Sequence, residues 1–233
     1  MNRNSATRSM EAATWVSIIA MLQFALGVMI SVLCYSGKFQ FTRQYLSELG
    51  CGGEFHALVF NLSLFTLGGG LAWFFGIFAR HTHHGNARLP IVGVCGTMAS
   101  LSLAAVGAIP MDFHEPLHVL AMISWLFFML PMSAAWISWL TWQRYSIGWM
   151  LLNKLFVFAI ALYLPASMIG LAPMWQKVVV LVSLLWMSTL CAEIVVILRR
   201  DGFNRLQRKQ VAEIVRESNA AALARMTHRR KTR

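Results

Sequence analysis

One ten-residue stretch carries several groups that can do chemistry. Residues 109–118 read Ile-Pro-Met-Asp-Phe-His-Glu-Pro-Leu-His, so two carboxylates and two imidazoles lie between two long apolar runs. Such groups can hold a metal ion, exchange protons or bind a polar head group. His114 and His118 have the spacing of a helical metal pair, but Pro116 disfavours helical backbone at Glu115. We therefore expect His114 to lie outside the helix that contains His118.

Polar residues of other segments are expected to lie at the same membrane surface. We call this candidate binding site the outer polar cluster, and it comprises Tyr45, Ser47, Glu48, Asn61, Asp112, His114, His118, Gln176 and Lys177. An ionised group at membrane depth is costly unless it is paired. Asp112 is therefore expected to pair with Lys177 or with a histidine.

A zinc site is the alternative use of these residues. Three protein ligands with one open position suit catalytic zinc, and the set that could supply them is His56, Asp112, His114 and His118. Lys177 would repel a cation, and Pro116 breaks the helical histidine pair. We therefore favour no metal and no cofactor, and keep zinc as the alternative.

The composition indicates a membrane protein. Of 233 residues, 58% are hydrophobic and only 12% are charged, whereas a soluble domain has roughly 25% charged residues. Runs of about 20 apolar residues can span a bilayer as helices, and six such runs cover residues 14–35, 56–79, 89–110, 117–141, 148–171 and 178–198. The third run is rich in glycine, alanine and serine, which favours close helix packing. The predicted fold is an all-α polytopic bundle of six transmembrane helices.

The basic residues predict how the bundle is oriented. With both termini cytoplasmic, only Lys38, Arg43 and Lys177 of the 20 basic residues lie in outer loops, which agrees with the positive-inside rule. Residues 1–13 then form a cytoplasmic N-terminus, residues 14–198 the transmembrane domain, and residues 199–233 a basic, amphipathic cytoplasmic tail. Such a tail favours anionic lipid over nucleic acid as a partner. The expected location is the inner (cytoplasmic) membrane of a bacterium, as a multi-pass protein.

Several short motifs follow one another in a characteristic order along these spans. They are Ser47-Glu-Leu-Gly50, Asn61, Gly107-x-x-Pro110-x-Asp112, His118, and Gln176-Lys177 with Trp186. In this order the chain resembles the integral membrane proteins called domain of unknown function 998 (DUF 998), over residues 14–198 and without the tail. Glu48 stands where we expect aspartate, and Lys177 where arginine is more usual. The resemblance implies the fold and the site but no activity.

Three functions are compatible with the sequence. In the favoured one, the outer polar cluster binds a lipid head group or a small solute, as in a transporter, accessory protein or sensor. In the second, the protein is a lipid hydrolase or transferase, with or without zinc. It weakly resembles the alkaline ceramidase and adiponectin-receptor hydrolases, because Ser47 and the alternative zinc set supply the residue types of those sites. In the third, the protein is a structural or assembly partner.

Two further questions stay open at this level. The expected partners are membrane lipids, a lipid or solute ligand, and a second copy or another membrane protein, but not nucleic acid. Cys34 and Cys51 both fall near the outer face, where an oxidising environment would permit a disulfide. The sequence alone does not decide whether that bond forms.

Overall fold

The protein is all-helical in the part of the chain that the computed structural model describes, namely residues 3–82, 88–142, 147–162 and 170–196. The helices are α1 (Arg3–Leu33), the 3₁₀ turn η1 (Leu46–Gly50), α2 (Phe55–His81), α3 (Arg88–Ala108), α4 (Glu115–Trp142), α5 (Ile147–Ala161) and a further helix over Ala172–Val196. The chain divides into two compact units, residues 1–192 and 193–233. The contacts discussed below lie within the first unit.

Five of these helices are long and apolar enough to cross a membrane. They cover Arg8–Leu33, Phe55–His81, Arg88–Ala108, Glu115–Thr141 and Ala172–Val196. The expected fifth span over residues 148–171 is described only in part, because residues 163–169, between α5 and Gly170, lie outside the described residues. The all-α membrane fold is confirmed. Six spans, the orientation and the 199–233 tail stay predictions, and the tail also lies outside the described residues.

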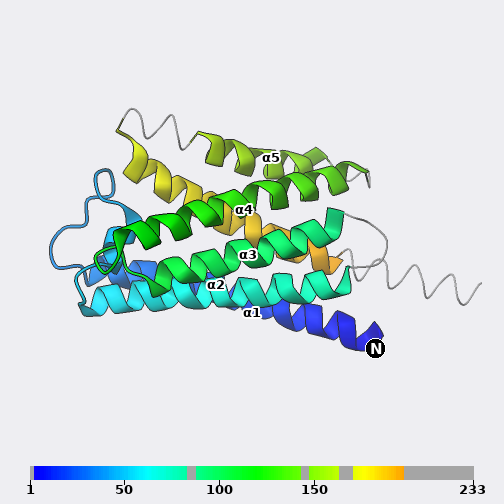
Figure 1. Cartoon of the computed structure of the whole chain (residues 1–233), viewed down its shortest axis with the longest axis horizontal. Coiled ribbons are helices and arrows are strands. Elements are labelled where there is room, and N and C mark those ends of the chain that lie inside the picture. Colours follow the sequence, from blue (N-terminus) through cyan, green and yellow to red (C-terminus); the bar gives the residue numbers. More distant parts are fainter. Residues whose placement is uncertain (1–2, 83–87, 143–146, 163–169, 197–233) are drawn as a thin grey trace, which may run out of the picture. The chain divides into compact units, whose positions relative to one another are not determined.

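The small residues of α3 set its distance from α2. α2 packs against both α1 and α3, and α3 packs in turn against α4 (Figure 1). At Gly68 of α2, an added Cβ would lie 2.4 Å from the backbone nitrogen of Ala104. At Gly107 of α3, it would lie 2.6 Å from the backbone nitrogen of Phe65. The two backbones therefore approach closely at points where one of the two helices has a glycine and no side chain to separate them.

Side-chain hydrogen bonds join α1 to α2 along their length. The Ser17 hydroxyl donates to the carbonyl of Gly70 at 3.2 Å, and Thr66 donates to the side-chain oxygen of Gln23 at 2.7 Å. Near the other end, the Ser31 hydroxyl donates to the backbone carbonyl of His56 at 2.9 Å. Bonds of this kind between membrane helices are worth about 0.6 kcal/mol each on average. They fix the α1–α2 pair that forms one wall of the site below.

Candidate functional site

The η1 turn closes one end of the bundle, which we call the η1 end, and two amide side chains hold it there. The Asn61 side-chain amide, from α2, donates to the Gly50 carbonyl at 2.8 Å. From the Ala172–Val196 helix, the Gln176 side-chain oxygen accepts the Leu46 backbone N–H at 2.7 Å. Ser47 lies between these two anchors and is buried. The turn is therefore tied at its start and at its end to two different helices.

Lys177 holds the segment that leads into η1. Its Nζ donates to the Gln44 carbonyl at 2.6 Å and to the Pro173 carbonyl at 2.9 Å. The same ammonium lies 5.4 Å from the centre of the Phe39 ring, within the range of a cation–π contact. Glu48, for its part, accepts the Tyr45 backbone N–H at 2.7 Å. Lys177 thus fixes the loop rather than presenting a free positive charge.

Asp112 ties the α3–α4 turn to the glycines that follow η1. Its carboxylate accepts the Gly52 backbone N–H at 2.8 Å. Gly52 and Gly53 have φ angles of +93° and +66°, which a residue with a Cβ rarely adopts. The predicted pairing of Asp112 with Lys177 or a histidine is therefore wrong. The Asp112 carboxylate and the Lys177 ammonium each bond to backbone groups of the loops, and these groups lie nearer to them than the opposite charge does.

The cysteines near this turn carry free thiols. Cys34 is exposed and Cys51 is half-buried, and neither takes part in a disulfide. Burial raises the pKa of the Cys51 thiol, and the nearby Asp112 and Glu48 carboxylates add to the rise, while a hydrogen bond from the Asp112 backbone opposes it. The Cys34–Cys51 disulfide left open by the sequence is not formed in this structure.

His118 is the most deeply buried titratable member of the outer polar cluster. It is 2% exposed, and its Nδ1 lies 2.7 Å from the Ile109 carbonyl. A carbonyl can only accept, so Nδ1 carries a proton, and in the neutral ring Nε2 is left as an acceptor. That Nε2 has no hydrogen-bond partner among the described residues. His118 therefore fastens the start of α4 to the end of α3 and keeps one unused acceptor.

The remaining histidines lie in separate environments. α4 begins at Glu115, so His114 is outside the helix as predicted, and its Nδ1 accepts the Leu117 N–H at 3.4 Å. His56 is buried in the first turn of α2, where its Nδ1 lies 3.3 Å from the Glu54 carboxylate without hydrogen-bond geometry. Within the described ranges, no three His, Cys, Asp or Glu residues are grouped to hold a metal ion. The alternative zinc set is thus not assembled.

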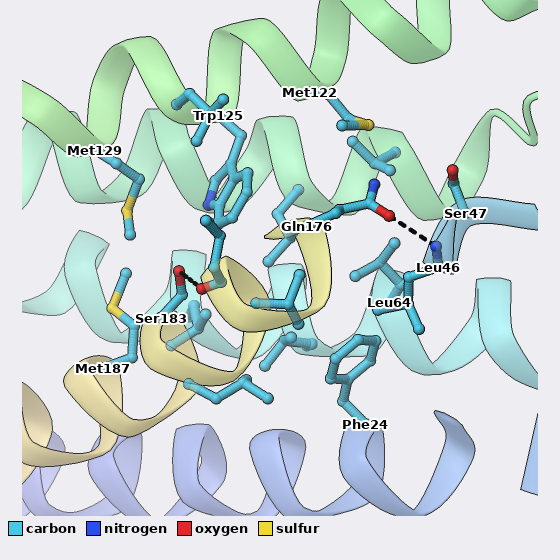
Figure 2. Close-up of a pocket in the computed structure, with 18 of the residues that line it drawn as sticks. Phe24, Leu46, Ser47, Leu64, Met122, Trp125, Met129, Gln176, Ser183 and Met187 are labelled. Atoms are coloured by element: carbon cyan, nitrogen blue, oxygen red, sulfur yellow. Dashed lines mark hydrogen bonds between the residues drawn. The ribbon is translucent and has the colours of Figure 1, made fainter. Parts of the chain in front are cut away.

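A cavity of about 90 Å³ lies inside the bundle beneath η1. Its walls come from α1, η1, α2, α3, α4 and the Ala172–Val196 helix, as Figure 2 shows for the residues labelled there. Nearly all of these residues are Leu, Val, Phe or Met, with Met129 and Met187 at one end. Ser183 lines the cavity near these methionines, but its hydroxyl is satisfied by the Val179 carbonyl at 2.6 Å. The cavity is therefore a largely apolar space.

Two unused hydrogen-bond donors stand at the η1 end of this cavity. Gln176 and Ser47 both line it, and they are 8% and 6% exposed. Because the Gln176 oxygen accepts from Leu46, its amide nitrogen is left over, and the described residues offer it no partner; the same holds for the Ser47 hydroxyl. In Figure 2 both groups point to the side of the cavity on which Met122 lies.

The structure therefore divides the outer polar cluster in two. Ser47 and Gln176 face the cavity, whereas Asn61, Asp112 and Lys177 bond to loop backbone. Glu48 belongs to η1 and bonds to Tyr45, the residue that precedes the turn, and His114 is exposed. Sequence reasoning missed the apolar walls, because their residue types are those of any membrane helix. Of the residues that line the cavity, only Ser47 and Gln176 stood out in the sequence, because they are polar.

Comparison with known proteins gives a family match over most of the chain. The model of the family described as "Protein of unknown function (DUF998)" matches residues 18–193. None of the curated proteins and none of the solved structures matches the sequence. The match covers every residue that lines the cavity, and it supplies no activity.

Proposed function

From the premise that the chain belongs to the DUF998 family of proteins of unknown function and is a membrane protein, we propose that it binds a membrane lipid in the cavity beneath η1. An apolar chain of the lipid fills the space between the helices, and its polar end bonds to Ser47 and Gln176. The protein then acts as a lipid-binding accessory, sensor or carrier. By the distribution of basic residues, the η1 end faces outward.

The observation that carries this proposal is an apolar cavity with two unused donors at one end. Ligand sites are mostly apolar, with a few placed polar groups that fix the orientation of the ligand. Ser47 and Gln176 are 6% and 8% exposed, and each presents to this space a donor that has no partner among the described residues. A ligand whose hydrocarbon chain packs against the apolar walls and whose polar end accepts from the two donors fits both features.

The apolar walls favour a lipid over a water-soluble solute. A cavity holds ordered water only where it offers two to four polar partners to each water molecule. Ser47 and Gln176 lie together at one end, and the rest of the lining is hydrocarbon and thioether apart from the Trp125 indole and the Ser183 hydroxyl, which already donates to the Val179 carbonyl. A hydrocarbon chain matches those walls, and the surrounding bilayer supplies such chains at high concentration.

Binding accounts for the arrangement better than hydrolysis does. A serine nucleophile needs a base within hydrogen-bond reach, and the Ser47 hydroxyl has no such partner among the described residues. Asn61, Asp112 and Lys177 instead position η1 over the cavity. The proposal therefore assigns them a supporting role, and assigns ligand contact to Ser47 and Gln176.

A pair of serine variants tests the proposal. Ser183 lines the cavity and donates to the carbonyl four residues earlier, whereas Ser102 makes the same kind of bond on α3 away from the cavity. Ser183→Leu should fill the space, and Ser102→Leu should leave it open. Native mass spectrometry of the purified chains should find one bound lipid in wild type and in Ser102→Leu, and little in Ser183→Leu.

A second pair of variants controls for the possibility that lipid is lost from a serine variant because that variant misfolds. Leu184 lines the cavity, while its neighbour Leu185 is 56% exposed on the outside of the same helix. Leu184→Phe should displace the lipid and Leu185→Phe should not, with both variants eluting as wild type does in size-exclusion chromatography. Equal lipid occupancy in all four variants would rule out the cavity as the binding site.

A further inference from the structure

We propose that the ligand of this site is an uncharged amphiphile with a single hydrocarbon chain, whose head carries an oxygen acceptor such as an ester or alcohol. This inference rests on the proposed function and names the class of lipid. It follows from the size of the cavity and from the chemistry of the few polar atoms at its η1 end.

The volume limits the ligand to one chain. A cavity needs about 10–15 Å³ to hold one group the size of a water molecule. The cavity of about 90 Å³ therefore holds on the order of six to nine such groups. A methylene is about the size of a water molecule. The cavity therefore accommodates a single chain of medium length, and it has no room for a second chain alongside.

The polar end must supply the selectivity of the site. A lipid tail is as apolar as a leucine side chain, so moving a chain from the bilayer into the cavity changes its surroundings little. Discrimination among lipids then depends on Ser47 and Gln176. Both present hydrogen-bond donors to the cavity, since the Gln176 oxygen is taken by the Leu46 N–H at 2.7 Å. The matching head group is an acceptor.

An anionic head would lack a counter-charge at this position. Burying an anion is costly unless a cation or several donors meet it. Lys177 follows Gln176 in the chain, but its ammonium bonds to the carbonyls of Gln44 and Pro173 at 2.6 and 2.9 Å. Glu48, next to Ser47, and Asp112, bonded to Gly52, add negative charge around the same turn. The site thus disfavours a phosphate or carboxylate.

A cationic head is disfavoured by the direction of the same hydrogen bonds. Gln176 turns its oxygen toward η1, where it accepts the Leu46 N–H at 2.7 Å, and so presents its N–H₂ group rather than its oxygen to the cavity. The groups left over are the amide N–H₂ of Gln176 and the hydroxyl of Ser47. The amide can only donate, and it would point its hydrogens at a positive charge. An uncharged ester or alcohol oxygen has no such conflict.

The test compares head groups on one chain. Four decyl-length probes are titrated against the purified full chain at neutral pH by native mass spectrometry: monodecanoylglycerol, decanoate, decyl phosphate and decyltrimethylammonium. We expect monodecanoylglycerol to bind at least tenfold tighter than the three charged probes. Tighter binding of decanoate, decyl phosphate or decyltrimethylammonium would overturn the inference.

Gln176→Glu gives a sharper readout. A carboxylate keeps the acceptor that anchors Leu46 but replaces the free donor with an oxygen. Monodecanoylglycerol should bind about tenfold more weakly, and decyltrimethylammonium should gain affinity. Ser47→Ala, which removes one hydroxyl and adds no charge, should weaken monodecanoylglycerol binding without any gain for the cation. Unchanged head-group preference in both variants would contradict the inference.

The failure of this inference can be told apart from failure of the proposed function. If a charged probe binds best and Ser183→Leu abolishes that binding, the cavity is a lipid site and only the head-group class is wrong. If none of the four probes binds, or if Ser183→Leu and Ser102→Leu bind all of them as wild type does, the cavity is not a lipid site. Each outcome refutes one statement or both.

Discussion

Two neighbouring glycines of α2 provide the most direct perturbation of the packing that shapes the cavity. A Cβ added at Gly68 would lie 2.4 Å from the backbone nitrogen and 2.7 Å from the Cα of Ala104 on α3. A Cβ added at Gly69 would meet nothing within 4 Å. Since backbone atoms cannot move aside as a flexible side chain can, Gly68→Ala must push α2 and α3 apart. Gly69→Ala should be accommodated freely.

The expected difference between the two variants can be worked out from these contacts. Alanine is favoured over glycine inside a helix by about 0.5–1 kcal/mol, and this gain applies to both positions. It therefore cancels in the comparison, which leaves only the over-packing at Gly68. Over-packing in a well-packed interior costs about 1–3 kcal/mol. With roughly 2–4 °C of melting temperature per kcal/mol for a chain of this length, Gly68→Ala should melt clearly below Gly69→Ala.

The assay is thermal unfolding of the two purified variants in the same detergent. Wild type should melt between them or close to Gly69→Ala. If Gly68→Ala proves as stable as Gly69→Ala, the close approach of α2 to α3 at Ala104 is wrong. The shape of the cavity, whose walls include residues of both helices, would then be wrong as well.

Three further predictions concern the η1 end and the orientation of the bundle. Asn61→Ala removes the bond to the Gly50 carbonyl at 2.8 Å and should cost about 1–3 kcal/mol for the unpaired acceptor, measured by thermal unfolding; an unchanged melting temperature would refute the anchor. A single cysteine at Lys38 should be labelled from outside intact cells and one at Arg88 should not, whereas the reverse pattern would invert the topology. The raised pKa of Cys51 means less thiolate at a given pH. Maleimide labelling of a variant whose only cysteine is Cys51 should thus rise at higher pH than that of a model peptide thiol, and coincident profiles would contradict its burial.

Length and composition were enough to predict the fold class. A run of about 20 apolar residues that crosses a bilayer must pair its backbone N–H and C=O groups within itself, which a helix does. The structure has five such helices in the part it describes. Local rules worked only in part at the α3–α4 turn. His114 lies outside α4 as expected, but α4 already begins at Glu115, where Pro116 was expected to disfavour helical backbone. The small residues of α3 correctly predicted close packing, as the contact at Ala104 shows.

The partners of the charged residues could not be predicted in the same way. The sequence places Asp112 and Lys177 at one depth, but it does not show where their side chains point. The backbone carbonyls of Gln44 and Pro173 satisfy Lys177, and the Gly52 N–H satisfies Asp112. Every residue has a backbone carbonyl, and all but proline have an N–H, so these partners leave no mark in the sequence.

The position of the cavity could not be predicted from the sequence either. Leu184 lines it while the adjacent Leu185 is exposed on the outer surface of the helix. The two residues are chemically identical, and a membrane helix is apolar on its lipid-facing side and on its buried side alike. Helical periodicity therefore separates the two faces poorly in a bilayer protein. The position of the cavity depends on how six elements pack around it, which only the three-dimensional structure provides.

The central claim is that a lipid chain occupies the cavity beneath η1, and an experimental density map of the protein purified from its own membrane tests it most directly. The account predicts one elongated, non-protein density that runs from Met187 towards η1 and ends within hydrogen-bond distance of Ser47 and Gln176. A cavity that is closed by repacked side chains, or that holds only separate water peaks bonded to Ser47 and Gln176, would contradict it.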